Sequence, residues 1–248
     1  MNSVYILWQD QVTTLWHPVA KLTRERDLYR LNYTRGANAS NNFTPFPNMD
    51  NLDKVYESHE LLPILQNRIL PKSRPEFKDL ISWLDLDPVE FDPLDYLSIT
   101  GGVRKTDNYR ILKLPDLIDG KYIYDFLISG IHYLNDDAKC VIENLKEGEE
   151  LQYYFETNNP VDKRAIALTE KKSGCFIGYC PRYLVRDFRK LIEGGEDGDS
   201  IFRIKKVNSK APASYRVICS FESLERKDYK PLMFDEYMAH TIVHEPKG

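Results

Sequence analysis

The chain is predicted to have an α+β fold, with a small α+β domain followed by a small β-barrel domain. Its 248 residues are enough for two small domains or for one larger domain with a buried core. Short aromatic or β-branched runs bounded by turn residues outnumber the helical patterns, which is typical of small barrels. Residues 115–120 have the composition of a short linker, so the domains are predicted to span residues 1–118 and 119–248.

The first half combines strands with a helical block. Its strands are expected at residues 4–8, 13–16, 28–33 and 109–114, and a loop rich in Asn, Pro and Gly at 36–51. Helices are expected at residues 60–68, 75–84 and 93–100. The second of these carries an apolar stripe at positions i, i+3, i+4 and i+7, and the third ends at Gly101 and Gly102, as a glycine cap would arrange.

The second half is richer in strands. They are expected at residues 121–131, 150–156, 164–169, 175–179, 201–207 and 215–221. Two helices are expected, at residues 136–145 and 181–193, and the second runs into an acidic, glycine-rich loop at 194–199.

Charge and targeting signals limit the classes of function. The formal net charge is −4, so a nucleic-acid site must be a local basic patch rather than a field over the whole surface. The N-terminal run MNSVYILWQDQ is too polar for a signal peptide, and no stretch reaches the ~18 apolar residues of a membrane span. We therefore expect a cytoplasmic protein without a membrane partner, whose four cysteines remain reduced.

Metal, cofactor and catalytic sites find little support. Cys175 and Cys180 have the spacing of a zinc pair, but no histidine follows them at finger spacing, so buried strand thiols are the expectation. His240 and His244 share i, i+4 spacing without an obvious third ligand. No Ser, Cys or carboxylate has partners of motif grade. The sequence predicts a binding protein with no catalytic residue, no metal and no cofactor.

The most informative segment is FETNNPVDKRAIAL, at residues 155–168. It predicts a strand, a polar turn and a second strand. Pro160 fixes its own φ and favours extended geometry at Asn159. The side chains of Asn159 and Asp162 can either bond to the local backbone or reach outward to a ligand. An Asx-type turn that only closes a hairpin remains the alternative.

The run NNPVDKRAIAL, followed by IGYCPR at residues 177–182 and a helix, resembles the HIRAN domain. Upstream, Gly130 to Tyr133 fit the family's first strand, and residues 145–151 fit its entry to the next strand. The match covers about 100 residues in order. The resemblance implies an OB-like barrel that binds single-stranded DNA, in fork-remodelling translocases by capturing a free 3′ end.

Carried over by position, the resemblance implies a nucleic-acid pocket that contains Asn159 and Asp162 of the turn. Asp162 would accept a hydrogen bond from a terminal sugar hydroxyl, which would favour a 3′-hydroxyl over a 3′-phosphate. Tyr133 would stack on a base. His132 stands where the family has Arg, and Tyr179 occupies the position after Gly178. Two of the family's rings are absent, because Leu134 and Val161 replace them.

Positive charge surrounds the turn and the following helix. It comes from Lys163, Arg164, Arg182, Arg186, Arg189 and Lys190. Arg182, Arg186 and Arg189 have i, i+4, i+7 spacing and share one face of the helix, which either tracks phosphates or is an ordinary solvated face.

The first half contains, in order, LYRLNY at residues 28–33, Phe46-Pro47, ELLP at 60–63 and FKDLISWL at 77–84. Together these motifs resemble the small N-terminal subdomain of HipA-type toxin kinases. No kinase core follows. This resemblance implies a rival function, an antitoxin or defence-system regulator that acts through protein contacts. The expected partners are thus single-stranded DNA or DNA ends, with a toxin, a translocase or a nuclease as the protein partner.

Overall fold

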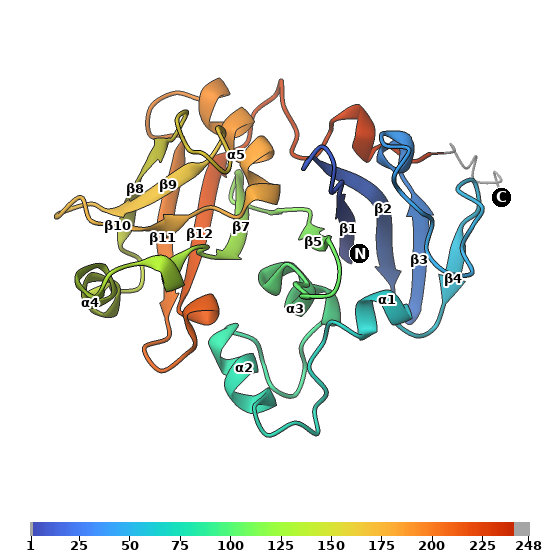
Figure 1. Cartoon of the computed structure of the whole chain (residues 1–248), viewed down its shortest axis with the longest axis horizontal. Coiled ribbons are helices and arrows are strands. Elements are labelled where there is room, and N and C mark those ends of the chain that lie inside the picture. Colours follow the sequence, from blue (N-terminus) through green and yellow to red (C-terminus); the bar gives the residue numbers. More distant parts are fainter. Residues whose placement is uncertain (1, 241–248) are drawn as a thin grey trace. The chain divides into compact units, whose positions relative to one another are not determined.

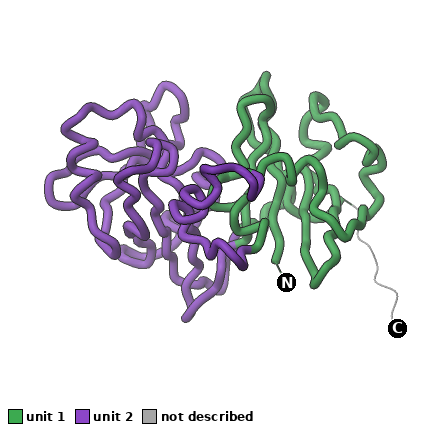
Figure 2. The backbone as a smooth tube through the Cα atoms, turned by 90° about the horizontal axis from the view of Figure 1, so that it is seen from below, with its two compact units in different colours: residues 1–70, 92–114, 232–248 green, residues 71–91, 115–231 purple. Residues whose placement is uncertain are grey.

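The computed structural model describes residues 2–240, which form two compact units (Figure 2). Unit 1 comprises residues 2–70, 92–114 and 232–240, and unit 2 comprises residues 71–91 and 115–231. Each unit is therefore assembled from segments that are separated in the sequence. His244 lies outside the described residues.

Unit 1 is built on a five-stranded antiparallel sheet with the order β4-β3-β2-β1-β5 (Figure 1). Its strands are β1 (Asn2–Gln9), β2 (Trp16–Glu25), β3 (Leu28–Tyr33), β4 (Tyr56–Ser58) and β5 (Tyr109–Lys113). Valine, isoleucine and leucine side chains of the central strands are fully buried, so the core lies along β1, β2 and β3.

The strand expected at residues 13–16 is wrong. Residues 11–13 form a turn, and the second strand starts at Trp16 and continues to Glu25. Pro18 hides this strand from a propensity reading, because proline cannot donate to a β-ladder. In the structure Pro18 lies at a register shift between β1 and β2, where a proline is tolerated.

Short helices complete unit 1. They are η1 (Arg35–Asn38), α1 (Pro63–Gln66) and α3 (Pro93–Thr100). The last confirms the expected helix: Asp92 accepts a hydrogen bond from the Leu94 amide at its start, and Gly101 takes a left-handed conformation (φ 63°) at its end. The expected helix at 60–68 is reduced to four residues.

Residues 232–240 return to unit 1 and pack on its sheet. The ring of Tyr237, in η4 (Asp235–Tyr237), meets the ring of Tyr5 edge-on at 4.8 Å. Ala239 forms an antiparallel bridge with Thr34, and Nδ1 of His240 lies 2.9 Å from a carboxylate oxygen of Asp53. This segment is therefore an integral part of unit 1.

Unit 2 is built on a seven-stranded antiparallel sheet with the order β10-β9-β8-β11-β12-β7-β6 (Figure 1). Its strands are β6 (Asp116–Ile118), β7 (Lys121–Leu127), β8 (Glu150–Phe155), β9 (Ile166–Glu170), β10 (Phe176–Tyr179), β11 (Ser200–Val207) and β12 (Val217–Leu224). The α+β fold class predicted from the sequence is confirmed, and the arrangement of this sheet is consistent with an OB-like barrel.

One isolated β-bridge joins the segment after β7 to β10, which is the strand at the opposite edge of this sheet. Just after β7, Ser129 exchanges both backbone hydrogen bonds with Tyr179 of β10, each 2.9 Å long. The approach requires a glycine at position 178, where φ is 137° and a Cβ would lie 2.6 Å from the Ser129 carbonyl oxygen. Gly178 therefore permits the strands to close.

Three α-helices belong to unit 2: α2 (Phe77–Trp83), α4 (Asp136–Asn144) and α5 (Arg182–Gly194). The predicted apolar stripe of α2 is confirmed, since all four of its members are buried. Helix α5 packs Phe188 into a core of buried rings from Phe126, Phe202 and Phe221. Its buried Asp187 accepts hydrogen bonds from the hydroxyls of Tyr124 and Tyr229. These contacts fix the position of α5 against the sheet.

Two expectations in this region are wrong. The segment expected to be a linker pairs with β7 as β6, through a tight turn at Asp119 and Gly120, both with positive φ. The strand expected to run to residue 131 ends at Leu127, and residues 131–133 form the 3-10 helix η2. Gly130, with φ 86°, redirects the backbone there.

Candidate functional site

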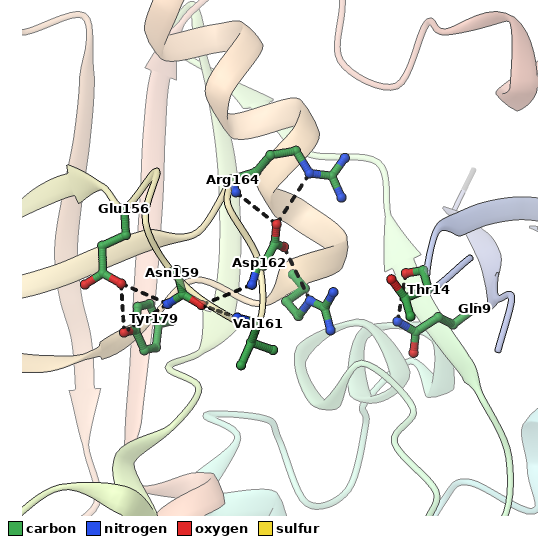
Figure 3. A network of polar contacts seen from close by, with 9 residues as sticks. Gln9, Thr14, Glu156, Asn159, Val161, Asp162, Arg164 and Tyr179 are labelled. Atoms are coloured by element: carbon green, nitrogen blue, oxygen red, sulfur yellow. Dashed lines mark hydrogen bonds and ion pairs between the residues drawn. The ribbon is translucent and has the colours of Figure 1, made fainter. Parts of the chain in front are cut away.

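The polar turn between β8 and β9 is organised by Asn159. Its Oδ1 accepts hydrogen bonds from the amides of Val161 (2.9 Å) and Asp162 (3.0 Å), and its Nδ2 donates to a Glu156 carboxylate oxygen at 2.9 Å (Figure 3). This is the Asx-type turn that the sequence left open as an alternative. Asn159 therefore shapes the loop with its own side chain.

Tyr179 ties the turn to β10. Its hydroxyl donates to Glu156 at 3.0 Å and lies 3.3 Å from Nδ2 of Asn159 (Figure 3). Burial raises the pKa of the Tyr179 hydroxyl, and the hydrogen bond and negative charge of Glu156 raise it further. The hydroxyl is therefore a proton donor at neutral pH, and it fixes the ring against the turn.

Asp162 is a buried carboxylate between two arginines. Oδ1 accepts the Arg164 amide at 2.9 Å and lies 3.5 Å from Arg164 Nε, and Oδ2 lies 3.3 Å from Arg182 Nε. The Asp162 side chain is only 7% exposed, whereas those of Arg164 and Arg182 are 49% and 37% exposed. The structure thus presents guanidinium groups to solvent and keeps the carboxylate behind them.

His132 and Tyr133 lie on η2 rather than on a strand. Their rings are 3.6 Å apart between centroids, and Tyr133 is 82% exposed. η2 follows directly on Gly130, where a Cβ would lie 3.5 Å from the Tyr179 ring. The Tyr133 ring is therefore available for stacking, in a segment that starts next to Tyr179.

The predicted basic group does not act as one surface. Arg189 pairs with Glu193 at 2.7 Å and lies over the ring of Phe155 at 4.1 Å, so its charge is engaged within the domain. Lys163, Arg186 and Lys190 are exposed. Of the predicted basic residues, only Arg164 and Arg182 meet at Asp162.

Sequence reasoning missed two residues of this region, Glu156 and Tyr154. The Glu156 carboxylate accepts hydrogen bonds from the Asn159 amide and the Tyr179 hydroxyl. Tyr154 pairs with Ala167 on β9, which in turn pairs with Tyr179, so these three residues share one face of the sheet. Tyr154 is 53% exposed. The sequence signal was Gln152, because a polar residue two positions earlier in a strand indicates that Tyr154 lies on the same, solvent-facing side.

Other chemistry of the described residues is limited. Cys180 and Cys219 are buried, and burial raises the pKa of both thiols, whereas Cys140 is exposed and Cys175 is half-buried. Within residues 2–240 no group of three His, Cys, Asp or Glu side chains is placed to hold a metal ion. No helix in the same range has the length and apolarity needed to cross a membrane.

A comparison with protein families supports the class of domain that the sequence resemblance implies. The family model of the HIRAN domain matches residues 122–223, which lie within unit 2. The comparison does not extend to unit 1, so its resemblance to the HipA subdomain stays a prediction. No curated protein matches the chain.

Two solved structures are similar to part of this chain. One is a Lactobacillus plantarum protein, with 18% identity, a TM-score of 0.33 and coverage of 43% of this chain and all of that chain. The other is the HIRAN domain of human HLTF, with 14% identity, a TM-score of 0.32 and coverage of 44% of this chain and 78% of that chain.

Proposed function

We propose that unit 2 is a nucleic-acid-binding module that holds single-stranded DNA at a strand end and has no catalytic activity of its own. The family match to the HIRAN domain supports DNA binding in general. The proposal for this chain is more specific. It names the strand form and the residues that make contact.

The observation that carries the proposal is a continuous set of contacts among separate segments. η2 begins beside the Tyr179 ring, the Tyr179 hydroxyl bonds to the turn at Asn159, and the turn places Asp162 between Arg164 and Arg182. These contacts support the proposal because they link the start of η2, Tyr179 and the turn around Asp162.

This arrangement offers the two kinds of contact that single strands use. Guanidinium groups of Arg164 and Arg182 can neutralise phosphates, and exposed rings of Tyr133 and Tyr154 can stack on bases. Base-edge recognition is not required for either contact, so binding is expected to tolerate many sequences. The overall charge of −4 confines the attraction to this patch.

Binding is tested by titrating an internally labelled single strand, its duplex and the corresponding RNA against the full chain at two salt concentrations. We expect the single-stranded DNA to bind best. Arg182→Gln should weaken binding about tenfold and lower the salt slope by about one. Lys210→Gln removes an equal charge from an exposed lysine between β11 and β12, and should have little effect.

The same samples report on catalysis, because a binding module should return every strand intact. Affinity no tighter than the ~10⁻⁴ M of non-specific contacts for all three ligands would contradict the proposal. A pull-down would then test the rival function. A protein recovered with the full chain in stoichiometric amount, and still bound after nuclease treatment, would favour the regulatory function over DNA binding.

A further inference from the structure

The contacts of Asp162 bear on which strand end unit 2 would hold. An acceptor for a terminal hydroxyl needs an exposed oxygen, but both Asp162 oxygens face an arginine and the side chain is 7% exposed. A carboxylate in this position positions its neighbours, because its buried negative charge attracts both guanidinium groups.

The arginines retain unused donors. Each meets Asp162 through Nε, at 3.5 Å for Arg164 and 3.3 Å for Arg182, and neither guanidinium has another hydrogen bond or ion pair among residues 2–240. A guanidinium has five N–H donors, so both Nη groups of each side chain remain for a ligand. The Nε distances also exceed the ~2.7–2.9 Å of strong charge-assisted hydrogen bonds, which leaves both groups able to adjust.

The local charge favours an anion. Two guanidinium groups around one carboxylate leave a net charge of about +1, and Lys163 lies between Asp162 and Arg164 in the chain. Both arginines meet the two oxygens of one carboxylate, so the two guanidinium groups lie beside the same side chain. Planar forks of this kind suit phosphate oxygens.

We propose that Arg164 and Arg182, positioned by Asp162, form a clamp for a terminal phosphate monoester of a nucleic-acid strand. This inference rests on the proposed function of unit 2 and specifies the end that it prefers. A terminal phosphate carries a charge of about −1.5 to −2 at neutral pH, against −1 for an internal diester, so a strand with a phosphorylated end binds more tightly than one with hydroxyl ends. The preference is opposite to that expected from a hydroxyl-reading Asp162.

The test compares three versions of one internally labelled single strand: both ends hydroxyl, 3′-phosphate and 5′-phosphate. We expect one phosphorylated strand to bind at least about threefold more tightly than the hydroxyl strand, because of its additional charge. The two phosphorylated strands identify which end the clamp takes. Equal affinity for all three strands, or tighter binding of the hydroxyl strand, would overturn the inference while leaving single-strand binding intact.

Variants assign the preference to the clamp. Arg164→Gln and Arg182→Gln should each reduce the preference to near unity, whereas Lys210→Gln should retain it. Both arginines are partly exposed, so we expect these variants to fold, which thermal unfolding monitors. Retention of the full preference in both arginine variants would contradict the clamp.

Asp162→Asn separates positioning from direct recognition. The amide oxygen can still accept the Arg164 backbone N–H, while the negative charge is lost. If Asp162 positions the arginines, the variant still favours a phosphorylated end, but less strongly than wild type, because the charge that holds both guanidinium groups is gone. If Asp162 instead read a hydroxyl, the wild-type protein would favour the hydroxyl end and the substitution would abolish that preference, which would overturn the inference.

Discussion

Ser129 and Tyr179 exchange two backbone hydrogen bonds of 2.9 Å, and this bridge joins the chain after β7 to β10. The same Tyr179 carries the hydroxyl that holds Asn159 and Glu156. Closure of the sheet and placement of the polar turn therefore depend on one residue. A substitution that opens the bridge should therefore disturb the candidate site even if it replaces none of the site's residues.

Gly178→Ala tests this dependence. The added Cβ would lie 2.5 Å from Ile128 Cγ2 and 2.6 Å from the Ser129 carbonyl oxygen, at a φ that alanine rarely adopts. We expect the free energy of unfolding of unit 2 to fall by about 2 kcal/mol or more. Chemical denaturation monitors the loss. Gly174→Ala, also at positive φ but with open space around it, should cost less; equal losses would contradict the role of close approach.

Asn159→Ala should loosen the turn. The variant removes the acceptor of the Val161 and Asp162 amides, at a cost of about 1–2 kcal/mol. Hydrogen exchange at these two amides should accelerate, and affinity for single strands should fall several-fold because Asp162 is no longer fixed. Asn158→Ala, at the exposed neighbouring position, is the matched control and should change neither quantity.

Val161→Tyr should increase affinity. Val161 is 71% exposed, so a larger side chain there displaces no core contact. A ring beside the arginines can stack on one base, which is worth ~1–3 kcal/mol in single-strand complexes, so a gain of about fivefold or more is expected. Titration of a labelled strand measures it. Val161→Leu adds apolar surface without a ring, and an equal gain from it would argue against stacking.

Asp10→Asn should make the stability of unit 1 less sensitive to a fall in pH. Hydrogen bonds from Ser40, from the Val12 and Thr13 amides and from Asn42 lower the pKa of Asp10 to about 2, led by that from Ser40 and opposed by burial. A folded-state pKa below the unfolded value means that the charge stabilises unit 1 above about pH 4 and that this stability is lost as pH falls towards 2.

The variant should therefore be less stable than wild type at pH 7, with a difference that shrinks at pH 3. Denaturant titrations at the two values measure it. Asp27→Asn, at an exposed position in the turn between β2 and β3, should change stability little at either pH. A difference for Asp10→Asn that stayed constant with pH would contradict the role of its charge.

Elements with strong local signals were predictable from the sequence. The apolar stripe predicted α2, and Gly101 predicted the end of α3. Residues whose role depends on tertiary contacts were not. A proline at position 18 is unfavourable for a strand by local propensity, and only the structure shows the register shift that accommodates it. The strand predicted to run to residue 131 ends earlier, because Gly130 redirects the backbone into η2.

The candidate site divides in the same way. Its residues could be gathered by family resemblance, and the Asx turn at Asn159 was among the alternatives. What Asp162 contacts was beyond the sequence, because Arg182 lies 20 positions further along the chain and reaches the turn only after β10 and α5 are in place. Exposure of Tyr133 and burial of Asp162 likewise depend on packing that local patterns do not encode.

Residues 232–240, which complete unit 1, set an order for synthesis. A ribosome makes residues 2–114 first, which include residues 71–91 of unit 2. It then makes the rest of unit 2, and only afterwards the segment that bridges Thr34 and covers Tyr5. During translation unit 2 can therefore reach its final fold while unit 1 still lacks its last segment. A fragment cut before residue 232 would leave the first-made unit permanently in that unfinished state.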